Sequence, residues 1–590
     1  MFDVTDTPIM ELEAYWGVGP KTRTRLEETL GVKAAVSAIE TGDVRALVNA
    51  GVDQSRATRI LRHAQSAEGM KLLATRDTRA VYKEMLDAVA EHAVSDVAAD
   101  RIRTLTPLTD REDMQQRLDA VDAGRTGWQR MSEKTRESVL FVFDAYDDAE
   151  GGRLAAVEAA LELSEIDVSE AVFDPVTELD TETLADAAVA LRALSETSVA
   201  SGADSELDQL RDAYEAIDRI SANPGDVLET LRSQGITDTS GFRTGLLEYV
   251  QTETTVGTER IRSAMAEDAI DATEFITETL RSLRSNLGEA IDERASTVRA
   301  ALEDDLEDAD TEIERAQTAV ALVARDLSLG RFAIEHDLHR PAYVDRETLA
   351  VVDARNLLID AKDDVQPITY AVGEHAIAPP GDEQVTVLTG ANSGGKTTLL
   401  ETLCAIEILA HMGLPVPAAE AEMSVLDRLV FHRRHASFNA GVLESTLQSV
   451  VPPLVSGNRT LMLVDEFEAI TEPGRAADLL GGLVRLTIEE GSLGVFVTHL
   501  AGDLEPLPDN ARVDGIFAKG LTDDLELNVD YQPRFGEIGR STPEFIVSRL
   551  VANASDRSEE AGFRMLADAV DTEIVQRTLS DAEWSGLDRT

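Results

Sequence analysis

The sequence predicts a multidomain protein in which a small all-α domain and a long all-α core precede an α/β domain and C-terminal helices. Its length of 590 residues exceeds what one hydrophobic core supports. A helical pattern runs through most of the first half, whereas short β-rich runs alternate with helical segments from about residue 341. We therefore expect four domains, at 1–66, 70–340, 341–545 and 546–590.

The chain is strongly acidic. Its 55 Lys and Arg against 110 Asp and Glu give a formal net charge of −55 and a pI near 4.4. The acidic excess is spread over every segment, unlike the block of an acidic tail. One hypothesis is adaptation to high intracellular salt, because screening over about 3 Å at 1 M makes such self-repulsion tolerable. A generically acidic mesophilic protein is the alternative. Net charge therefore does not argue against nucleic-acid binding, and local charge has to be considered instead.

Neither a membrane span nor a secretory signal is expected. The sequence lacks an apolar run of roughly 18 residues, and its N-terminus lacks a basic region followed by an apolar stretch. Cys404 is the only cysteine, which rules out an intrachain disulfide and a cysteine metal cluster. These features predict a cytoplasmic location.

Two glycine-containing turns mark residues 1–66. The segment Trp16-Gly-Val-Gly-Pro-Lys-Thr-Arg-Thr-Arg25 resembles a helix-hairpin-helix unit, and Ala50-Gly-Val-Asp-Gln-Ser-Arg-Ala-Thr-Arg59 resembles a second, weaker copy. Glycines at such turns expose N–H groups at a helix N-terminus, where a phosphate is favoured. Between Trp16 and His63, 8 Lys or Arg face 5 Asp or Glu, so this segment carries a charge of +3.

We therefore predict that this domain contacts the DNA backbone without reading sequence. A small structural domain with the same turn is the alternative. The candidate DNA-binding residues are Gly17, Gly19, Lys21, Arg23, Arg25, Gly51, Arg56 and Arg59.

Residues 70–340 predict long paired helices. Between Pro224 and Pro341 the sequence contains no proline, and acidic residues fill the faces opposite the apolar positions. One apolar stripe at helical spacing consists of Ile276, Leu280, Leu283, Leu287 and Ile291. The charged faces are solvated surface, and we assign them no chemistry.

A phosphate-binding loop occurs at Thr389-Gly-Ala-Asn-Ser-Gly-Gly-Lys-Thr-Thr398. It follows an apolar strand and opens a helix over 397–410, which is the context that the G-x-x-x-x-G-K-[ST] motif requires. Backbone N–H groups of such a loop surround the β-phosphate, Lys396 reaches the β- and γ-oxygens, and the Thr397 hydroxyl ligates Mg²⁺. The candidate ATP-binding residues are Gly390, Ala391, Asn392, Ser393, Gly394, Gly395, Lys396, Thr397 and Thr398.

Two later strands supply candidate catalytic groups. The apolar run 461–464 ends at Asp465 and Glu466, where Asp465 would support Mg²⁺ and Glu466 would orient or deprotonate the attacking water. A second apolar strand ends at Thr498-His499, and His499 is placed to sense the γ-phosphate. We therefore predict an ATPase with Lys396, Glu466 and His499 as catalytic residues and with Thr397 and Asp465 as metal ligands.

These motifs resemble those of the MutS family. The phosphate loop has the family's asparagine and double glycine before the lysine, and residues 405–418 resemble the helix that ends in its valine-proline-alanine turn. Upstream, residues 95–110 and 117–121 are similar to the start of the MutS core. The resemblance covers roughly residues 75–550 and implies an ABC-like MutS ATPase domain. It also implies a homodimer whose composite sites couple nucleotide state to clamp closure on DNA, with the helices of 70–340 as levers and clamp.

The sequence departs from the family pattern in four places. Only about 66 residues precede the core, so the mismatch-reading domain is missing, and the one Phe-x-Glu triplet, at 535–537, lies beyond the ATPase. The family's Ser-Thr pair, offered to the partner's nucleotide, is replaced by Asn439-Ala440 ahead of Glu444. We find no nuclease module after the ATPase. These departures indicate a short, second-branch relative with an N-terminal helix-hairpin-helix, and its charge suggests an archaeal, halophilic source.

The resulting prediction is a homodimeric, DNA-dependent ATPase that uses ATP and Mg²⁺ and clamps duplex, mismatched or branched DNA in repair or recombination. A separate nuclease partner is left open. One alternative is a structural DNA-binding protein in which ATP is only a conformational switch. Another is a coiled-coil ABC-type chromosome ATPase, but residues 432–460 lack the Leu-Ser-Gly-Gly signature which that class needs.

Overall fold

The computed structural model describes residues 12–166, 170–195, 198–236, 239–359, 365–377, 381–390, 395–434, 440–456, 459–466, 473–504, 506–521, 527–539, 543–555, 557–570 and 575. The chain forms two compact units. Unit 1 comprises Met1–Leu140, Val168–Asp174 and Ala321–Thr590, and unit 2 comprises Phe141–Asp167 and Pro175–Val320. The helical stretch 70–340 is therefore shared between two units, a division that its pattern does not reveal.

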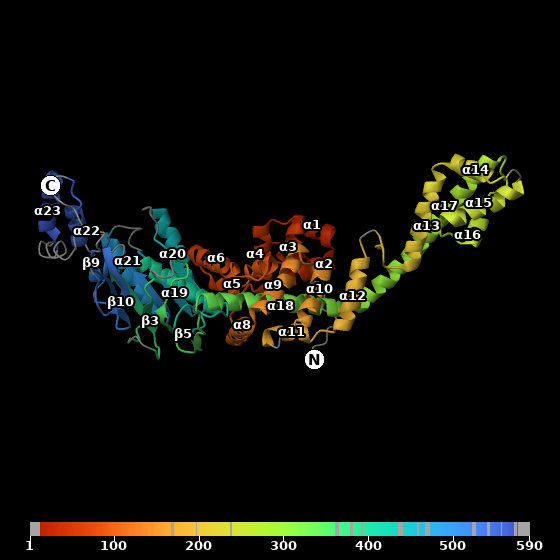
Figure 1. The fold of residues 1–590 in the computed structure, drawn as a ribbon. Coiled ribbons are helices and arrows are strands. Elements are labelled where there is room, and N and C mark those ends of the chain that lie inside the picture. The colour runs from red at the N-terminus through yellow and green to blue at the C-terminus, as the bar shows by residue number, and fades with distance from the viewer. Residues whose placement is uncertain are drawn as a thin grey trace. The chain divides into compact units, whose positions relative to one another are not determined.

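Unit 1 begins with a four-helix N-terminal domain, preceded by a short 3-10 helix at Leu12–Ala14 (Figure 1). Its helices are α1 (Pro20–Leu30), α2 (Val32–Glu40), α3 (Val44–Asn49) and α4 (Gln54–Gln65). Pro20 suits the first position of α1 because its missing N–H is not needed there. Leu26, Ile39, Leu47 and Leu61 form a fully buried core between the helices.

The N-terminal domain is fastened to the helices that follow it in unit 1. Arg62 donates two hydrogen bonds, at 2.9 and 2.6 Å, to the carbonyl oxygen of Arg103. Arg45 lies 3.4 Å from Asp100 in α7. The helices that follow in unit 1 are α5 (Gly69–Leu72), α6 (Arg76–Ala90), α7 (Asp96–Ile102) and α8 (Arg111–Arg130). Helix α9 (Glu133–Asp148) begins in unit 1, and its residues from Phe141 on belong to unit 2.

The named elements of unit 2 are all helices, and one isolated bridge pairs Leu194 with Val199. Its longest helix is α17 (Ala272–Asp308), whose predicted apolar stripe is buried from Ile276 to Leu287 against α13 (Ser205–Ser221) and its neighbours. Arg294 of α17 also forms two hydrogen bonds with Asp204, the N-cap of α13. The other helices are α10 (Gly152–Glu165), α12 (Thr181–Ala193), α14 (Pro224–Ser233), α15 (Thr239–Glu253) and α16 (Thr258–Ser263). The short η2 (Ala171–Phe173) belongs to unit 1, and the residues of α11 (Asp174–Thr177) after Asp174 belong to unit 2.

Helix α18 (Asp310–Glu335) leads back into unit 1 and crosses α8 at close range. A Cβ added at Gly124 would lie 2.0 Å from the Asp326 carbonyl oxygen, and one at Gly330 would lie 2.4 Å from the Arg125 nitrogen. Glycine is therefore required at both crossing positions, because any side chain would force the helices apart.

The α/β part of unit 1 holds two sheets. The larger has the strand order β10-β9-β4-β8-β7-β6, and only the β9–β10 pair is antiparallel. Its strands are β4 (Val385–Gly390), β6 (Arg428–His432), β7 (Thr460–Asp465), β8 (Leu493–Val497), β9 (Ala511–Leu521) and β10 (Leu527–Phe535). The smaller sheet has the order β1-β5-β2-β3, with β1 (Ala342–Val344), β2 (Thr348–Ala354), β3 (Ile368–Gly373) and β5 (Glu420–Ser424).

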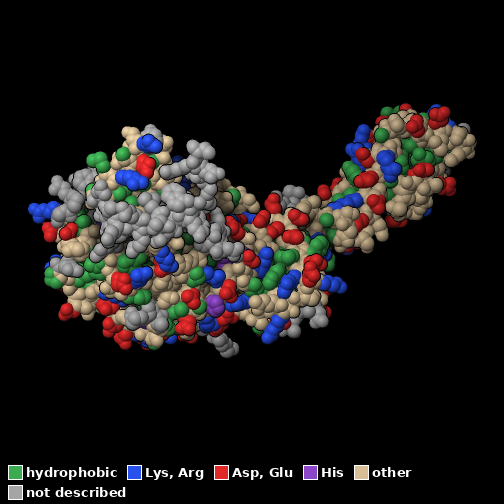
Figure 2. All heavy atoms as spheres, turned by 60° about the vertical axis from the view of Figure 1, so that its left-hand side comes forward, with side chains coloured by type: hydrophobic (Ala, Val, Ile, Leu, Met, Phe, Trp, Pro, Cys, Tyr) green, Lys and Arg blue, Asp and Glu red, His purple; other side chains and the backbone are tan. Residues whose placement is uncertain are grey.

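Helices cover the larger sheet. Helix α19 (Lys396–His411) is buried along nearly its whole length, and α20 (Ala440–Leu454) and α21 (Pro473–Glu489) contribute to a second core with the sheet. A 3-10 turn at Ala501–Asp503 follows β8, and α22 (Pro543–Ala552) and α23 (Arg557–Val570) follow the sheet (Figure 1). None of the helices in the described ranges is long and apolar enough to cross a membrane. Figure 2 shows Asp and Glu side chains scattered over the visible face, with Lys and Arg among them.

Candidate nucleotide-binding site

Parallel strands bring the predicted motifs to one edge of the larger sheet. In the register of the sheet, Leu388 of β4 and Asp465 of β7 both pair with Val497 of β8. The Thr498 N–H donates to the Leu388 carbonyl oxygen at 3.0 Å, and the Glu466 N–H donates to the Val497 carbonyl oxygen at 3.1 Å. The residues that follow β4, β7 and β8 therefore lie next to one another at the same edge of the sheet.

The phosphate loop leaves β4, whose six residues are all buried, and enters α19. Gly390 has φ 135°, and a Cβ there would lie 2.3 Å from the Ile516 carbonyl oxygen. Gly395 is the N-cap residue of α19 and has a left-handed backbone conformation. Because glycine has no side chain, the N-cap residue does not occupy the N–H groups of the first helical turn. The candidates Ala391, Asn392, Ser393 and Gly394 lie outside the described residues.

Lys396 and Thr397 lie at the first turn of α19. The Lys396 side chain is buried, and its Nζ donates to the Gly390 carbonyl oxygen at 2.9 Å. The Thr397 hydroxyl donates to Asp465 Oδ2 at 2.7 Å. Thr398, also a candidate, lies in the same turn, and its carbonyl oxygen accepts the Thr402 hydroxyl.

Asp465 is almost fully buried, and burial raises the pKa of its carboxyl, with the Thr397 hydrogen bond opposing that shift. Its Oδ1 is buried and lacks a hydrogen-bond partner among the described residues. An unsatisfied buried carboxylate oxygen is costly unless a ligand completes it. Because hard oxygen donors suit Mg²⁺, which keeps waters and phosphate oxygens as its other ligands, Asp465 and Thr397 fit this ion.

Glu466 is held in a strained backbone conformation with φ 42°, which is uncommon for a non-glycine residue and frequent at functional sites. His499 Nε2 lies 3.0 Å from Glu466 Oε1, and Arg434 Nη1 lies 2.5 Å from Oε2. The hydrogen bond from His499 is the main cause that lowers the pKa of Glu466. The structure therefore keeps this carboxylate ionised and oriented.

Two residues at this edge carried no signal in the sequence. The Tyr531 ring of β10 lies against the phosphate loop, since a Cβ added at Gly395 would be 2.8 Å from the ring. Tyr531 is 40% exposed, and an exposed ring in this position is able to stack on a base. Arg434 follows β6, which carries no recognised motif.

The far end of α19 is anchored to the helical part of unit 1. The Arg117 guanidinium of α8 donates to the Met412 carbonyl oxygen at 2.9 Å, and burial lowers the pKa of Arg117 to about 10. The Leu108 N–H donates to the His411 carbonyl oxygen at 2.6 Å. Both hydrogen bonds provide partners for carbonyl groups that have none within the helix at its C-terminal end. One helix thus runs from the phosphate loop to the segment before α8.

The predicted DNA-binding residues form two turns that brace each other. Gly17 and Gly51 both have φ 82°. Arg56 donates to the Gly17 carbonyl oxygen and Arg25 donates to the Gly51 carbonyl oxygen, each at 2.9 Å. These two arginines therefore link the two hairpins to each other.

The other predicted DNA-binding cations of this domain differ in whether they form hydrogen bonds or ion pairs within it. Arg23 pairs with Glu27 at 2.7 Å and with Glu13 at 3.5 Å, and Arg59 donates to the Ser55 carbonyl oxygen. Lys21 is exposed at the start of α1, and within the described ranges its ammonium group has no hydrogen bond or ion pair.

The two hairpins differ at their helix N-termini. Asp53 caps α4 through its own carboxylate, which accepts the N–H groups of Ser55 at 3.1 Å and of Arg56 at 3.2 Å. These bonds and the Ser55 hydroxyl lower the pKa of Asp53. Helix α1 follows Gly19, which offers no side-chain cap. Of the two hairpins, only the first therefore has a helix N-terminus without a side-chain cap among the residues that the structure describes.

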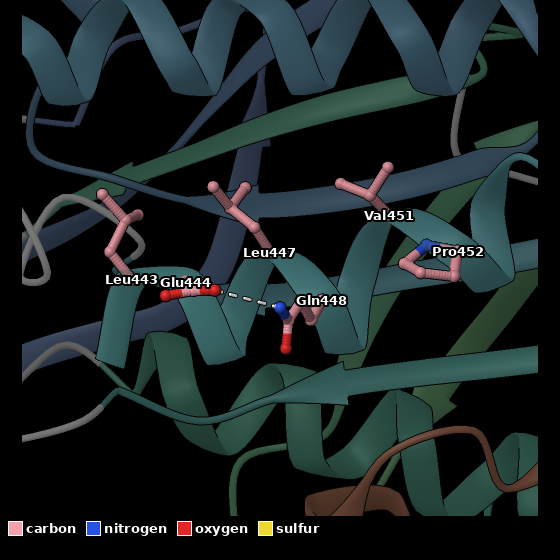
Figure 3. Close-up of a pocket in the computed structure, with 6 residues that line it drawn as sticks. All are labelled: Leu443, Glu444, Leu447, Gln448, Val451 and Pro452. Carbon is pink, nitrogen blue, oxygen red and sulfur yellow. Dashed lines mark hydrogen bonds between the residues drawn. The ribbon is translucent and has the colours of Figure 1, made fainter. Parts of the chain in front are cut away.

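Helix α20 lies beside the same sheet and presents an apolar stripe. Leu443, Leu447 and Val451 are half-buried and point to one side of the helix, where they line a pocket (Figure 3). Asn439 lies outside the described residues. The helix also contains Ser445 and Thr446 directly after Glu444.

Comparison with known proteins gives consistent matches. Residues 386–466 match the family described as MutS domain V. The DNA-binding protein MutS2 of Pyrococcus furiosus is 48% identical over 217 residues, which are 36% of this chain and 38% of that protein. The endonuclease MutS2 of Shouchella clausii is 28% identical over 252 residues, 42% of this chain and 30% of that protein.

A third relative belongs to the mismatch-repair branch. The DNA mismatch repair protein MutS of Granulibacter bethesdensis is 27% identical over 322 residues, 51% of this chain and 33% of that protein. The chain thus spans between 30% and 38% of the length of these three relatives. Together, these matches show that residues 386–466 are similar to MutS domain V and that part of the chain is similar to MutS2 and MutS proteins.

Proposed function

We propose that this chain is a DNA-dependent ATPase of the MutS type that acts as a homodimeric clamp on duplex, mismatched or branched DNA in repair or recombination. The observation that carries the proposal is the convergence of Lys396, Thr397, Asp465, Glu466 and His499 on one sheet edge. Thr397 is bonded to Asp465 and His499 to Glu466, while Lys396 is bonded to the Gly390 carbonyl oxygen of the phosphate loop. This combination of cation, hydroxyl and carboxylates is what triphosphate hydrolysis requires.

In the proposed reaction, water attacks the γ-phosphorus and the bond to the β–γ bridging oxygen breaks, giving ADP and phosphate. Lys396 binds the β- and γ-oxygens once it leaves Gly390. Glu466 orients the water and takes its proton, and His499 keeps the carboxylate in place. Mg²⁺, held through Thr397 and Asp465, would supply charge neutralisation on the phosphates. Tyr531 would stack on the base.

For DNA contact, we propose the first hairpin as the phosphate-binding turn. Its open helix N-terminus and the exposed Lys21 favour an anion there. At the second hairpin, Asp53 occupies the equivalent N–H groups with its own carboxylate. DNA backbone binding would therefore rest on one hairpin rather than on both.

For the homodimer, we propose that a second copy covers the α20 stripe. This helix lies beside the strand that ends at Asp465, so a copy seated on Leu443, Leu447 and Val451 would approach the nucleotide site. Leu447→Glu should yield a monomer in size-exclusion chromatography. The same variant should show reduced turnover in ATPase assays.

For coupling between the two ligands, we propose α19 as the connecting element. Its first turn carries Lys396 and Thr397, and its last carbonyl groups are held by Arg117 and Leu108. A shift of the phosphate loop on nucleotide binding would therefore reach the helices that follow the DNA-binding domain.

The test compares ATP turnover of the wild type and Glu466→Ala, each with and without DNA. We expect turnover in the wild type, stimulation by DNA, and loss of both in the variant. Absence of turnover in either protein, with nucleotide still bound, would favour a structural protein in which ATP acts only as a switch. Deleting residues 1–66 should weaken binding to DNA, and an unchanged affinity for homoduplex, mismatch, junction and loop would remove the hairpins from the mechanism.

A further inference from the structure

The carboxylate of Glu466 has both oxygens engaged in this structure. His499 holds Oε1 and Arg434 holds Oε2. The two partners come from different strands, since His499 follows β8 and Arg434 follows β6. A positive guanidinium on Oε2 makes the carboxylate a weaker base and fills the position from which it would accept a proton from water. The arrangement seen here therefore orients Glu466 without leaving it ready to act.

Arg434 is poorly fixed in comparison with the residue before it. The Arg433 N–H donates to Asp77 Oδ2 at 2.9 Å, and its Nε lies 3.0 Å from Glu401 Oε1. The backbone is thus tied down immediately before Arg434. By contrast, the Arg434 side chain is 55% exposed, and the Glu466 carboxylate is its one ion-pair partner within the described ranges.

The strength of the ion pair between Arg434 and Glu466 decides whether a bound nucleotide can compete for Arg434. In this pair the Arg434 side chain is exposed and the Glu466 side chain is largely buried. Solvent at the exposed guanidinium screens part of the attraction, and ordering the long Arg434 side chain opposes the pair. A terminal phosphate carries more negative charge than a carboxylate and accepts the planar guanidinium with two oxygens. A triphosphate bound at the Lys396 loop would therefore compete successfully for Arg434, provided that its terminal phosphate comes within reach of Glu466.

We propose that Arg434 exchanges partners during the ATPase cycle, pairing with Glu466 in the empty site and with the terminal phosphate of a bound triphosphate in the loaded site. The exchange rests on the proposed ATPase function. It frees Oε2 of Glu466 for the attacking water only when a γ-phosphate is present, and it lets the site distinguish a triphosphate from a diphosphate. Arg434 is a positioning residue toward Glu466 and a direct contact toward the nucleotide.

A different role would leave Arg434 permanently on Glu466 as a shield that reduces repulsion between the carboxylate and the phosphates. Both roles predict weaker triphosphate binding when Arg434 is removed. They differ when Glu466 has also lost its charge, because a shield then has nothing to shield. A direct contact with the phosphate remains useful in that background.

The test measures equilibrium binding of ADP and of an ATP analogue with an imido group between the β- and γ-phosphorus, each with Mg²⁺. Arg434→Gln should weaken the analogue about 10-fold, the effect of losing one charge-assisted hydrogen bond, and leave ADP within about 2-fold. Arg434→Lys should recover part of the loss. Arg428→Gln is the matched control, because Arg428 starts the same strand at its opposite end and donates to the Asp427 carbonyl oxygen.

The decisive comparison repeats Arg434→Gln in a Glu466→Gln background. Exchange predicts that the loss of analogue affinity persists or grows there, since Arg434 contacts the phosphate and its competitor is gone. A loss that disappears in this background, or equal losses for ADP and analogue, would overturn the exchange while leaving the ATPase proposal intact. A folded wild-type chain that binds neither nucleotide would overturn both.

Discussion

Two helices of unit 1, α19 and α1, begin at glycine-containing turns of the kind that binds phosphate, and they differ in what surrounds them. At α19, neighbouring strands bring Asp465, Glu466 and His499 to the turn, and a buried lysine lies within it. At α1, the neighbouring groups are exposed cations, several of which are engaged within the domain. The turn alone offers N–H groups to an anion in both places. Chemistry on that anion requires the second set of groups, which only the sheet supplies.

The same comparison explains a difference between the two hairpins. Each has a glycine with φ 82° and an arginine that bonds to the other hairpin. One ends in Gly19 and the other in Asp53, and the carboxylate of Asp53 takes the N–H groups that a phosphate would use. A single side chain thus decides whether such a turn is open to a ligand.

The largest expected effect is a loss of ATP turnover without a loss of nucleotide binding at the edge of the larger sheet. Glu466→Gln should lower ATP turnover at least about 100-fold, because a positioned general base contributes that much or more. Affinity for the imido analogue should not fall. Phosphate release and equilibrium binding measure the two quantities, and Glu490→Gln, an exposed glutamate after α21, is the control. A parallel loss of binding would mean that Glu466 builds the site rather than acting in it.

The next effect tests the anchoring of the far end of α19. Arg117→Met should lower the free energy of unfolding by about 2 kcal/mol, since it removes a charge-assisted hydrogen bond to the buried end of the helix. DNA stimulation of turnover should fall as well if α19 connects the two ligands. Urea unfolding and ATPase assays check both. Normal stimulation in a destabilised variant would limit Arg117 to a structural role.

A smaller effect is expected at the second hairpin. Asp53→Asn keeps an N-cap of equal quality and removes the negative charge from the turn. DNA affinity should rise about 3-fold to 10-fold at moderate salt, and the melting temperature should stay the same. Lys21→Gln should lower the affinity and reduce the salt slope by about 1. Unchanged DNA binding in both variants would place the DNA elsewhere on the chain.

The smallest effect concerns a partly buried ion pair in unit 2, between Arg294 and Asp204. Hydrogen bonds from Arg294 lower the pKa of Asp204 to about 2. An acid with a lowered folded-state pKa stabilises the fold above its unfolded pKa of about 3.9, and this contribution is lost as the pH falls toward the folded value. The melting temperatures of wild type and Asp204→Asn should therefore converge as the pH falls from about 5 to about 2. A constant difference would show that the charge of Asp204 contributes nothing.

The sequence was most informative where a local pattern carries the chemistry. Lys396 and Thr397 follow a strand and open a helix, and Asp465, Glu466 and His499 follow apolar strands, so their meeting at one edge was predictable from parallel topology. Arg434, Tyr531 and Arg117 were not predictable, because their contacts depend on strand register and side-chain packing. The division of 70–340 between two units likewise depends on tertiary contacts. Asp53 could have been recognised, since aspartate before a helical segment is an N-cap signal.

The most direct test is a crystal structure of this chain with the imido ATP analogue and Mg²⁺. The account predicts the phosphates between the turn at Gly390–Gly395 and the carboxylates of Asp465 and Glu466, with the metal on Thr397 and Asp465. A phosphate loop that stays empty at saturating nucleotide, or a triphosphate bound away from these carboxylates, would contradict it.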